Sequence, residues 1–389
     1  MLFRSATFNG IDMAGVNSYK DGVISRLYKG LSGLIKSRNV TYVEGYGKLI
    51  SANTVEVNGT QYTGKNVVLA TGSYAKTLPG LDVDGKRVIT SDHALNMDYV
   101  PKSAIVLGGG VIGCEFASVW KSFGSEVTII EALPRLVALE DETSSKQLER
   151  AFRKRKIDFE VGSRFKSHTV NADSVTVTLE NDKSFTAEVL LVAVGRGPVS
   201  AGIGYEEQGI KMDRGYVLVD DKCRTNVPGV WAVGDLIPTL QLAHVGFQEG
   251  ILVAEEIAGL NPRPINYDGV PRVTYSEPEV ASVGLSTAVA KERGYDVVEI
   301  SYDLAGNGKS QILKTAGSVK LVAEKNGPVL GVHMVGDRVG ELLAEAQLIF
   351  NWEASADDVA PLIHAHPTMS EAMGEAFLAL AGKPLHAHG

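Results

Sequence analysis

The chain has 389 residues, 44% of them hydrophobic and 22% charged, which suits roughly two to four domains with ample core. Its net charge of −8 gives no sign of the basic surface that binds nucleic acid. No apolar run approaches the roughly 20 residues of a membrane helix. We therefore expect neither a nucleic-acid nor a membrane partner. Two cysteines and the lack of a signal peptide are typical of a cytoplasmic protein.

The first part of the chain reads unlike the start of a domain. Residues 1–17 show no strand or clear helix, and residues 1–5 look like an arbitrary start. Helical spacing of apolar residues then predicts a helix over 19–38, which Asn39 ends. Residues 66–72 predict a buried strand, which needs a parallel sheet that nothing upstream supplies. The alternative is a small independent β-unit.

Short strands are expected between this helix and the buried strand. An Asn58-Gly59 pair predicts a hairpin turn within this meander. The expected strands cover residues 40–47, 55–57 and 61–62.

A glycine turn between two strands gives the strongest functional signal. Gly108, Gly110 and Gly113 follow a short apolar strand and open a helix, and Glu131 stands at the end of the next strand. This context favours a dinucleotide-binding turn over a plain tight turn, because diphosphate binds free N–H groups at a helix N-terminus. Glu131 would accept hydrogen bonds from ribose hydroxyls, which favours NAD over NADP. Arg135 lies close in sequence and leaves NADP open.

The rest of the chain alternates strands and helices and then changes pattern. Asp235 follows a glycine at a strand's carboxyl end, where it could bind a cofactor hydroxyl. From residue 270 the pattern is antiparallel, which indicates a separate α+β domain. Expected strands cover residues 157–161, 174–179, 185–194, 230–233, 272–275, 319–323 and 329–335, and expected helices cover 147–154, 242–259, 341–351 and a segment after 368.

Several of these segments together resemble one family. ATG at 70–72, GGGVIG at 108–113, VGR at 194–196 and the TNVPGVWAVGD run at 225–235 are similar to the flavin-dependent pyridine nucleotide–disulfide oxidoreductases. HAHPTMSE at 364–371 and GNGK at 306–309 are similar to the dihydrolipoamide dehydrogenases within that family.

The resemblance implies an α/β fold with two Rossmann-like three-layer nucleotide-binding domains, the first incomplete, and a C-terminal α+β dimerisation domain. We expect a partial FAD-binding domain over residues 1–100 and an NAD-binding domain over 101–224. A returning FAD-binding segment would cover 225–268, and the interface domain 269–389.

The resemblance also implies cofactor contacts and a homodimer, with no metal. Glu115 would lie near the nicotinamide ring. The NAD contacts would be Gly108, Gly110, Gly113, Glu131 and Gly195, and the FAD contacts Gly47, Thr71, Gly72, Asp235 and Ala243.

By the same resemblance, His366 would be the acid–base residue, oriented by Glu371, and would act at the flavin of the other subunit. We expect a ring nitrogen of His366 within about 3.2 Å of a Glu371 oxygen. The bond before Pro367 is a candidate cis bond. Spacing alone favours a capping box in which Thr368 is the N-cap, which is compatible with the base–orienter pair. His364 is the alternative base.

The chain departs from the family in one respect. Neither a first Gly-x-Gly-x-x-Gly unit for FAD nor a CxxxxC pair occurs, and Cys114 and Cys223 are expected to be buried, inert thiols. We therefore expect a truncated dihydrolipoamide dehydrogenase that is inactive alone. Its partners would be lipoyl domains of 2-oxoacid dehydrogenase or glycine cleavage complexes. The alternatives are a dithiol-independent transhydrogenase or diaphorase, and a non-catalytic NAD-binding dimerising fragment.

Overall fold

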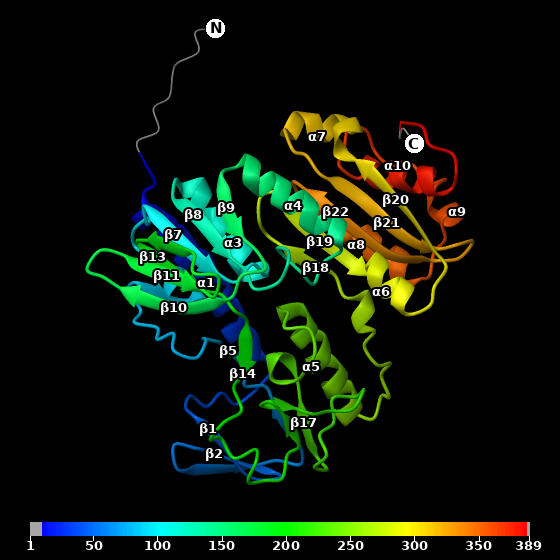
Figure 1. Ribbon diagram of the computed structural model, residues 1–389. Helices are drawn as coiled ribbons and strands as arrows, with labels where there is room; N and C mark the ends of the chain where they lie inside the picture. The colour runs from blue at the N-terminus through cyan, green and yellow to red at the C-terminus, as the bar shows by residue number, and fades with distance from the viewer. Residues whose placement is uncertain (1–9, 387–389) are drawn as a thin grey trace. The chain divides into compact units, whose positions relative to one another are not determined.

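A computed structural model describes residues 10–386 of the chain (Figure 1). The expectation about residues 1–5 lies outside the described residues. No helix in the described part is long and apolar enough to cross a membrane.

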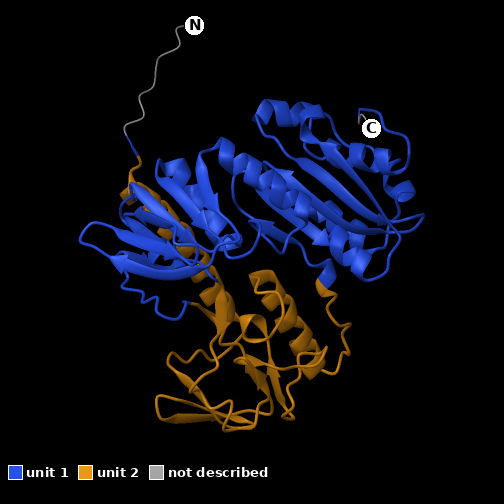
Figure 2. Cartoon of the chain, viewed as in Figure 1, with its two compact units in different colours: residues 1–10, 77–194, 268–389 blue, residues 11–76, 195–267 orange. Residues whose placement is uncertain are grey.

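The chain forms two compact units (Figure 2). Unit 2 combines Ile11–Lys76 with Gly195–Tyr267, and unit 1 contains Thr77–Val194 and the C-terminal part from Asp268. Residues 195–224, which the sequence groups with the NAD-binding domain, therefore cluster with unit 2.

Unit 2 starts with a helix longer than predicted. Helix α1 (Met13–Ser37) begins before residue 19 because the Asp12 carboxylate caps it, accepting a hydrogen bond from Gly15 N at 3.1 Å. None of the residues of α1 is buried, so the apolar side chains that predict this helix lie at the surface.

An antiparallel meander follows, made of β1 (Gly47–Ser51), β2 (Thr54–Val57) and β3 (Thr60–Thr63). The predicted Asn58-Gly59 turn is confirmed, with φ of 51° and 78°. The strand predicted over 40–47 is wrong. Val57 ends β2 and pairs with Gly47, so the residues before Gly47 have no strand to pair with.

The strand predicted over 66–72 is shorter, β4 (Val67–Leu69), and only Leu69 of it is buried, contrary to the prediction. It pairs in parallel with β17 (Val230–Ala232). Leu69 and Val230 share a core with Leu252 of α5 (Ala243–Ile257). Unit 2 also contains the antiparallel pairs β5 (Ser73–Ala75) with β14 (Arg196–Pro198) and β15 (Met212–Asp213) with β16 (Tyr216–Val217).

The first half of unit 1 confirms a three-layer Rossmann-like arrangement. Its parallel sheet has the order β6-β13-β7-β8-β9. On the central strand β7, Ala104 and Val106 pack with the helices, whereas Ile105 and Leu107 pack with an antiparallel meander on the other face. The strands are β6 (Val88–Ile89), β7 (Ser103–Leu107), β8 (Glu126–Ile130), β9 (Ile157–Glu160) and β13 (Val189–Val192), the helices α3 (Val111–Phe123) and α4 (Glu142–Lys154), and the meander β10 (Phe165–Val170), β11 (Val175–Leu179) and β12 (Ser184–Ala187).

Two sequence expectations in this half need correction. The single strand predicted over 185–194 is two strands, β12 and β13, which belong to different sheets and divide at Glu188. Strand β10 was not predicted. The half-exposed polar sequence of β10 has no strong alternation, so only its pairing with β11 identifies it.

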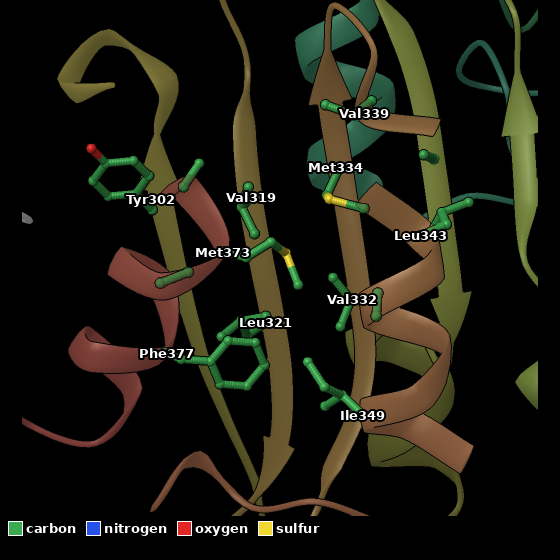
Figure 3. Packing of buried hydrophobic residues seen from close by; sticks show 14 of the residues in the cluster. Tyr302, Val319, Leu321, Val332, Met334, Val339, Leu343, Ile349, Met373 and Phe377 are labelled. Carbon is green, nitrogen blue, oxygen red and sulfur yellow. The ribbon is translucent and has the colours of Figure 1, made fainter. Parts of the chain in front are cut away.

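The C-terminal half of unit 1 is the expected α+β domain. It contains one antiparallel sheet, the C-terminal sheet, whose strand order is β18-β19-β22-β21-β20. Figure 3 shows side chains of β21, β22, α8 and α10 meeting in one core, among them Leu321, Met334, Leu343 and Phe377. The strands are β18 (Arg272–Thr274), β19 (Glu279–Gly284), β20 (Val297–Asp303), β21 (Ser318–Glu324) and β22 (Val329–Gly336), and the helices are α8 (Val339–Asn351) and α10 (Glu371–Leu380). Strands β19 and β20 were not predicted.

Short helices complete unit 1: α2 (Ser91–Ala94), α6 (Thr287–Glu292), α7 (Gly308–Leu313) and α9 (Ala356–Val359).

Candidate active site

The glycine turn lies between the carboxyl end of β7 and the start of α3. A Cβ at Gly108 would meet the Ala193 carbonyl, and a Cβ at Gly113 would meet the Gly108 carbonyl, so the protein's own packing requires both glycines. Gly108 also has a φ of 115°. A Cβ at Gly110 would meet no protein atom within 4 Å. The space at Gly110, the N-cap of α3, therefore suits a ligand phosphate.

Glu131 follows β8 beside this turn. Its Oε2 accepts a hydrogen bond from Gly109 N at 2.5 Å, and its Oε1 accepts one from Leu133 N at 2.7 Å. A carboxylate offers about four lone-pair sites, so two backbone bonds leave acceptor capacity for the hydroxyls of a ribose. The two backbone bonds also fix the direction of the carboxylate.

The guanidinium of Arg135 is hydrogen-bonded to nearby groups of the chain. Its Nη2 donates to the carbonyls of Ala138 (2.6 Å) and Glu140 (3.1 Å), and its Nε donates to Ser145 Oγ at 3.2 Å. A guanidinium bound in this way is not directed at a ribose phosphate. The geometry therefore favours NAD at the point where the sequence leaves NADP open.

Glu115 lies on α3 and binds the backbone of the residue that directly follows β18. Its Oε1 accepts a hydrogen bond from Tyr275 N at 2.8 Å. Burial raises the pKa of Glu115, and the Tyr275 N–H offsets only part of that effect.

In unit 2, Asp235 forms a polar network that the sequence did not predict. Ser73 Oγ donates to Asp235 Oδ2 at 2.5 Å, and Arg196 Nε donates to Ser73 Oγ at 2.7 Å. Arg196 Nε lies 3.8 Å from the same Asp235 oxygen. Both contacts use Oδ2, which leaves Oδ1 as the acceptor for a cofactor hydroxyl. The VGR motif was the available signal for Arg196.

Thr71 and Gly72 hold the strand segment beside this network. Thr71 Oγ1 donates to the Val199 carbonyl at 2.5 Å, and the Gly72 carbonyl accepts from Val199 N at 2.9 Å. Gly195 has a φ of 114°, and its carbonyl accepts from Lys76 N at 2.9 Å.

The remaining predicted flavin contacts lie at the ends of elements. Ala243 is the first residue of α5, whose N-terminal N–H groups suit an anion, and Gly47 begins β1. These residues remain expected contacts of FAD. The described residues contain no second Gly-x-Gly-x-x-Gly turn for its diphosphate.

His366 and Glu371 come together as predicted. His366 Nδ1 lies 2.7 Å from Glu371 Oε1, inside the expected 3.2 Å, and the His366–Pro367 peptide bond is cis. Burial acts to raise the pKa of Glu371, but hydrogen bonds from Thr368 N and His366 outweigh it and lower the pKa. The carboxylate is therefore ionised at neutral pH, and the His366 side chain is 77% exposed.

The predicted capping box is half correct. Glu371 Oε2 does accept a hydrogen bond from Thr368 N at 2.8 Å. Thr368 is not the N-cap, however: α10 begins at Glu371 after Ser370. The Thr368 hydroxyl donates instead to the Ala365 carbonyl at 2.6 Å, within the turn that carries the histidine.

His364, the alternative base, is enclosed. Its Nε2 lies 2.8 Å from Glu345 Oε1 of α8, and its side chain is only 12% exposed. A Cβ at Gly374 would lie 2.6 Å from His364 Nδ1, so the ring packs against α10. His366 is therefore the more accessible of the two rings. Nothing in the sequence singled out Glu345.

Cys114 and Cys223 are free and buried. Burial raises the pKa of Cys114, and raises that of Cys223 to about 12, so both thiols stay protonated. Among the described residues, no group of three or more His, Cys, Asp or Glu side chains could hold a metal ion.

Comparisons with known proteins agree on one family. Models of the pyridine nucleotide-disulphide oxidoreductase family and of its dimerisation domain match residues 4–250 and 270–377. Dihydrolipoyl dehydrogenase 1, mitochondrial, from Arabidopsis thaliana is 40% identical over 389 residues, covering 97% of this chain and 76% of that protein. Dihydrolipoyl dehydrogenase from Bacillus subtilis is 38% identical over 410 residues, covering 98% and 86%.

Solved structures give the same likeness. LpdA from Mycobacterium tuberculosis matches with a TM-score of 0.89 at 25% identity, covering 96% of this chain and 84% of that one. The HOCl-induced flavoprotein disulfide reductase RclA from Escherichia coli matches with a TM-score of 0.87 at 26% identity, covering 94% and 86%.

Proposed function

Because the chain belongs to the pyridine nucleotide-disulphide oxidoreductase family, whose members use FAD and NAD, we propose that it serves the NAD-dependent oxidation of protein-bound dihydrolipoyl groups. The observation that carries the proposal is the bonded pair of His366 and Glu371 within the HAHPTMSE segment. The likeness to dihydrolipoyl dehydrogenases over nearly the whole chain supports it.

The proposed cofactor contacts divide between the two units. In unit 1, Gly108, Gly110 and Gly113 would accommodate the NAD diphosphate, Glu131 would bind the adenosine ribose, and Glu115 would lie near the nicotinamide. Gly195 is also a proposed NAD contact. The FAD contacts would be Gly47, Thr71, Gly72, Asp235 and Ala243, and when bound, the two cofactors would supply the electron transfer.

The residues of this chain would supply the proton transfer. Glu371 holds His366 through Nδ1, which selects the tautomer with its proton on that nitrogen and leaves Nε2 as the acceptor. Nε2 would take the proton of a dihydrolipoyl thiol and so generate the thiolate nucleophile. The Glu371 carboxylate then stabilises the imidazolium that forms.

The dimerisation-domain match supports a homodimer. Within it, His366 would act at the flavin of the partner subunit. Lipoyl domains of 2-oxoacid dehydrogenase or glycine cleavage complexes would be the substrates. We also propose a cytoplasmic location, which the two free thiols favour, and cell fractionation tests it.

A second candidate function, a dithiol-independent transhydrogenase or diaphorase, is favoured by one observation. Both cysteines are buried and lie far apart in sequence, so neither forms a dithiol relay within these 389 residues. A non-catalytic NAD-binding, dimerising role would show NADH binding and a dimer without flavin turnover.

The test joins the chain to an N-terminal segment with the family's first glycine turn and CxxxxC pair. Changing His366→Gln should abolish dihydrolipoamide oxidation but spare NADH-dependent reduction of an artificial acceptor. His364→Gln is the matched control and should retain most turnover. Dihydrolipoamide oxidation that survives in the His366 variant would make His364 the next candidate base, and wild-type diaphorase activity alone would favour the second function.

A further inference from the structure

One face of the C-terminal sheet carries a row of polar side chains. Strand register places Arg272 of β18 beside Ser282 of β19, Ser282 beside His333 of β22, and His333 beside Lys320 of β21. Lys320 alternates with the core residues Val319 and Leu321, so the row lies on the face opposite the apolar core of α8 and α10. Ser282, His333 and Lys320 are buried, and such groups need partners.

Three side chains of this row pair with two consecutive acidic residues before α4. Lys320 Nζ also lies 3.1 Å from Glu299 Oε2 of β20, and His333 Nε2 lies 2.9 Å from the Leu285 carbonyl. Lys320 Nζ lies 2.9 Å from Asp141 Oδ1, and both side chains are buried. Arg272 Nε lies 3.4 Å from Glu140 Oε1, and Ser282 Oγ donates to Glu140 Oε2 at 2.5 Å. Three strands of the C-terminal sheet, β18, β19 and β21, therefore hold the end of a segment that belongs to the Rossmann-like half.

That segment, residues 133–141, begins two residues after Glu131. At its middle, Val137 has a φ of 42°, a left-handed conformation that a β-branched residue keeps only where its surroundings enforce it. Val137 N donates to the Gly109 carbonyl at 2.8 Å, and Gly109 N donates to Glu131 Oε2. The segment thus joins the acidic pair to the glycine turn through short, continuous contacts.

We propose that Lys320 and Arg272 are positioning residues for NAD. By holding Glu140 and Asp141, they keep residues 133–141 in the conformation that places Gly109 and Glu131 for the adenosine ribose. Neither side chain is proposed to touch the coenzyme. The inference rests on the proposed NAD contact of Glu131.

Lys320 also keeps Asp141 charged. Burial acts to raise the pKa of Asp141, but the hydrogen bond and charge of Lys320 and the Thr143 N–H outweigh it and lower the pKa. Asp141 caps α4 by accepting from Thr143 N at 2.9 Å. Asn is an equally good N-cap, so Asp141→Asn removes the ion pair and keeps the cap through its Oδ1. Its NH2 group would face Thr287 N, which donates to Asp141 Oδ2 at 3.1 Å in the wild type.

The experiment measures binding of NADH and of ADP-ribose by calorimetry to wild type, Lys320→Met, Asp141→Asn and the double variant. The exposed Lys325, on the turn after β21, supplies the matched control Lys325→Met. ADP-ribose carries the adenosine half without nicotinamide. Amide exchange at Val137 reports the segment itself.

Each single variant should bind both ligands about tenfold more weakly, within the range of coupling through packed networks. The double variant should be no weaker than either single variant, exchange at Val137 should rise, and Lys325→Met should match wild type. Wild-type affinity in the single variants, or fully additive losses, overturns the proposal. If Lys320→Met does not fold, unchanged affinity in Asp141→Asn overturns it. Wild type that binds no NADH would instead refute the proposed function.

Discussion

Replacing Glu131 with glutamine should remove the preference for NADH. The carboxylate of Glu131 accepts hydrogen bonds from Gly109 N and Leu133 N and retains two acceptor sites for the ribose hydroxyls. Glutamine offers one carbonyl oxygen, and its NH2 group would face one of these backbone donors. The variant therefore loses charge at both ribose bonds and gains a donor–donor contact.

The expected size of the effect follows from the bond types. A hydrogen bond to a charged group contributes about 1.5–3 kcal/mol and a neutral one about 0.5–1.5 kcal/mol, so two ribose bonds lose roughly 2–3 kcal/mol. That loss corresponds to NADH binding about 30- to 150-fold more weakly. NADPH should lose less, because the same change removes the repulsion between the carboxylate and the 2′-phosphate.

Titration of both coenzymes by calorimetry checks this prediction. Glu126→Gln, at the exposed start of the same strand β8, is the matched control and should bind NADH as wild type does. Two results would refute the reasoning: equal affinity of wild type for NADH and NADPH, or unchanged NADH affinity in Glu131→Gln.

Three further predictions concern flavin, acid and thiols. The 389-residue chain should lose FAD on gel filtration, because the proposed contacts at Asp235 and the start of α5 would hold only part of it; a yellow protein with one flavin per chain contradicts this. The folded-state pKa of Asp141, about 2, lies below its ordinary value of 3.8. The ionised Asp141 therefore contributes its full stabilisation of the folded chain above about pH 4, and this contribution declines as the pH falls toward 2. That contribution is about 2 kcal/mol. In Asp141→Asn, the free energy of unfolding measured in urea should therefore depend less on pH over this range. Cys114 and Cys223 should not react with a thiol reagent at pH 8 until the chain is unfolded in urea; reaction in the native state would contradict their burial.

The sequence predicted elements best where local chemistry decides the structure. The glycine turn after β7 and the Asn58-Gly59 hairpin depend on backbone conformations that few residue types adopt, so their residues identify them. Strand β10 and the division at Glu188 depend on pairing with distant strands, which no local pattern encodes. The helix α1 shows a third case, in which a capping aspartate extends the helix beyond its apolar spacing.

The residues of the candidate site also differ in how well the sequence predicted them. The pair of His366 and Glu371 lies within six consecutive residues, so the sequence predicted its distance correctly. Glu345, Ser73 and Arg196 bind predicted site residues from other elements, and their roles appear only after folding. Motif reasoning therefore identified the groups proposed to contact ligands better than the groups that hold them.

The C-terminal sheet has a different task on each of its two faces. On the apolar face, α10 packs its buried side chains on β21 and presents Glu371 at its first turn, so the core fixes the carboxylate that holds His366. On the polar face, Lys320 of the same strand β21 holds Asp141, at the end of the segment that follows Glu131. Since the side chains of a strand alternate between faces, a shift of β21 by one residue would exchange the two sets. Correct pairing of β21 is therefore a common condition for the proposed base and for the proposed coenzyme contact.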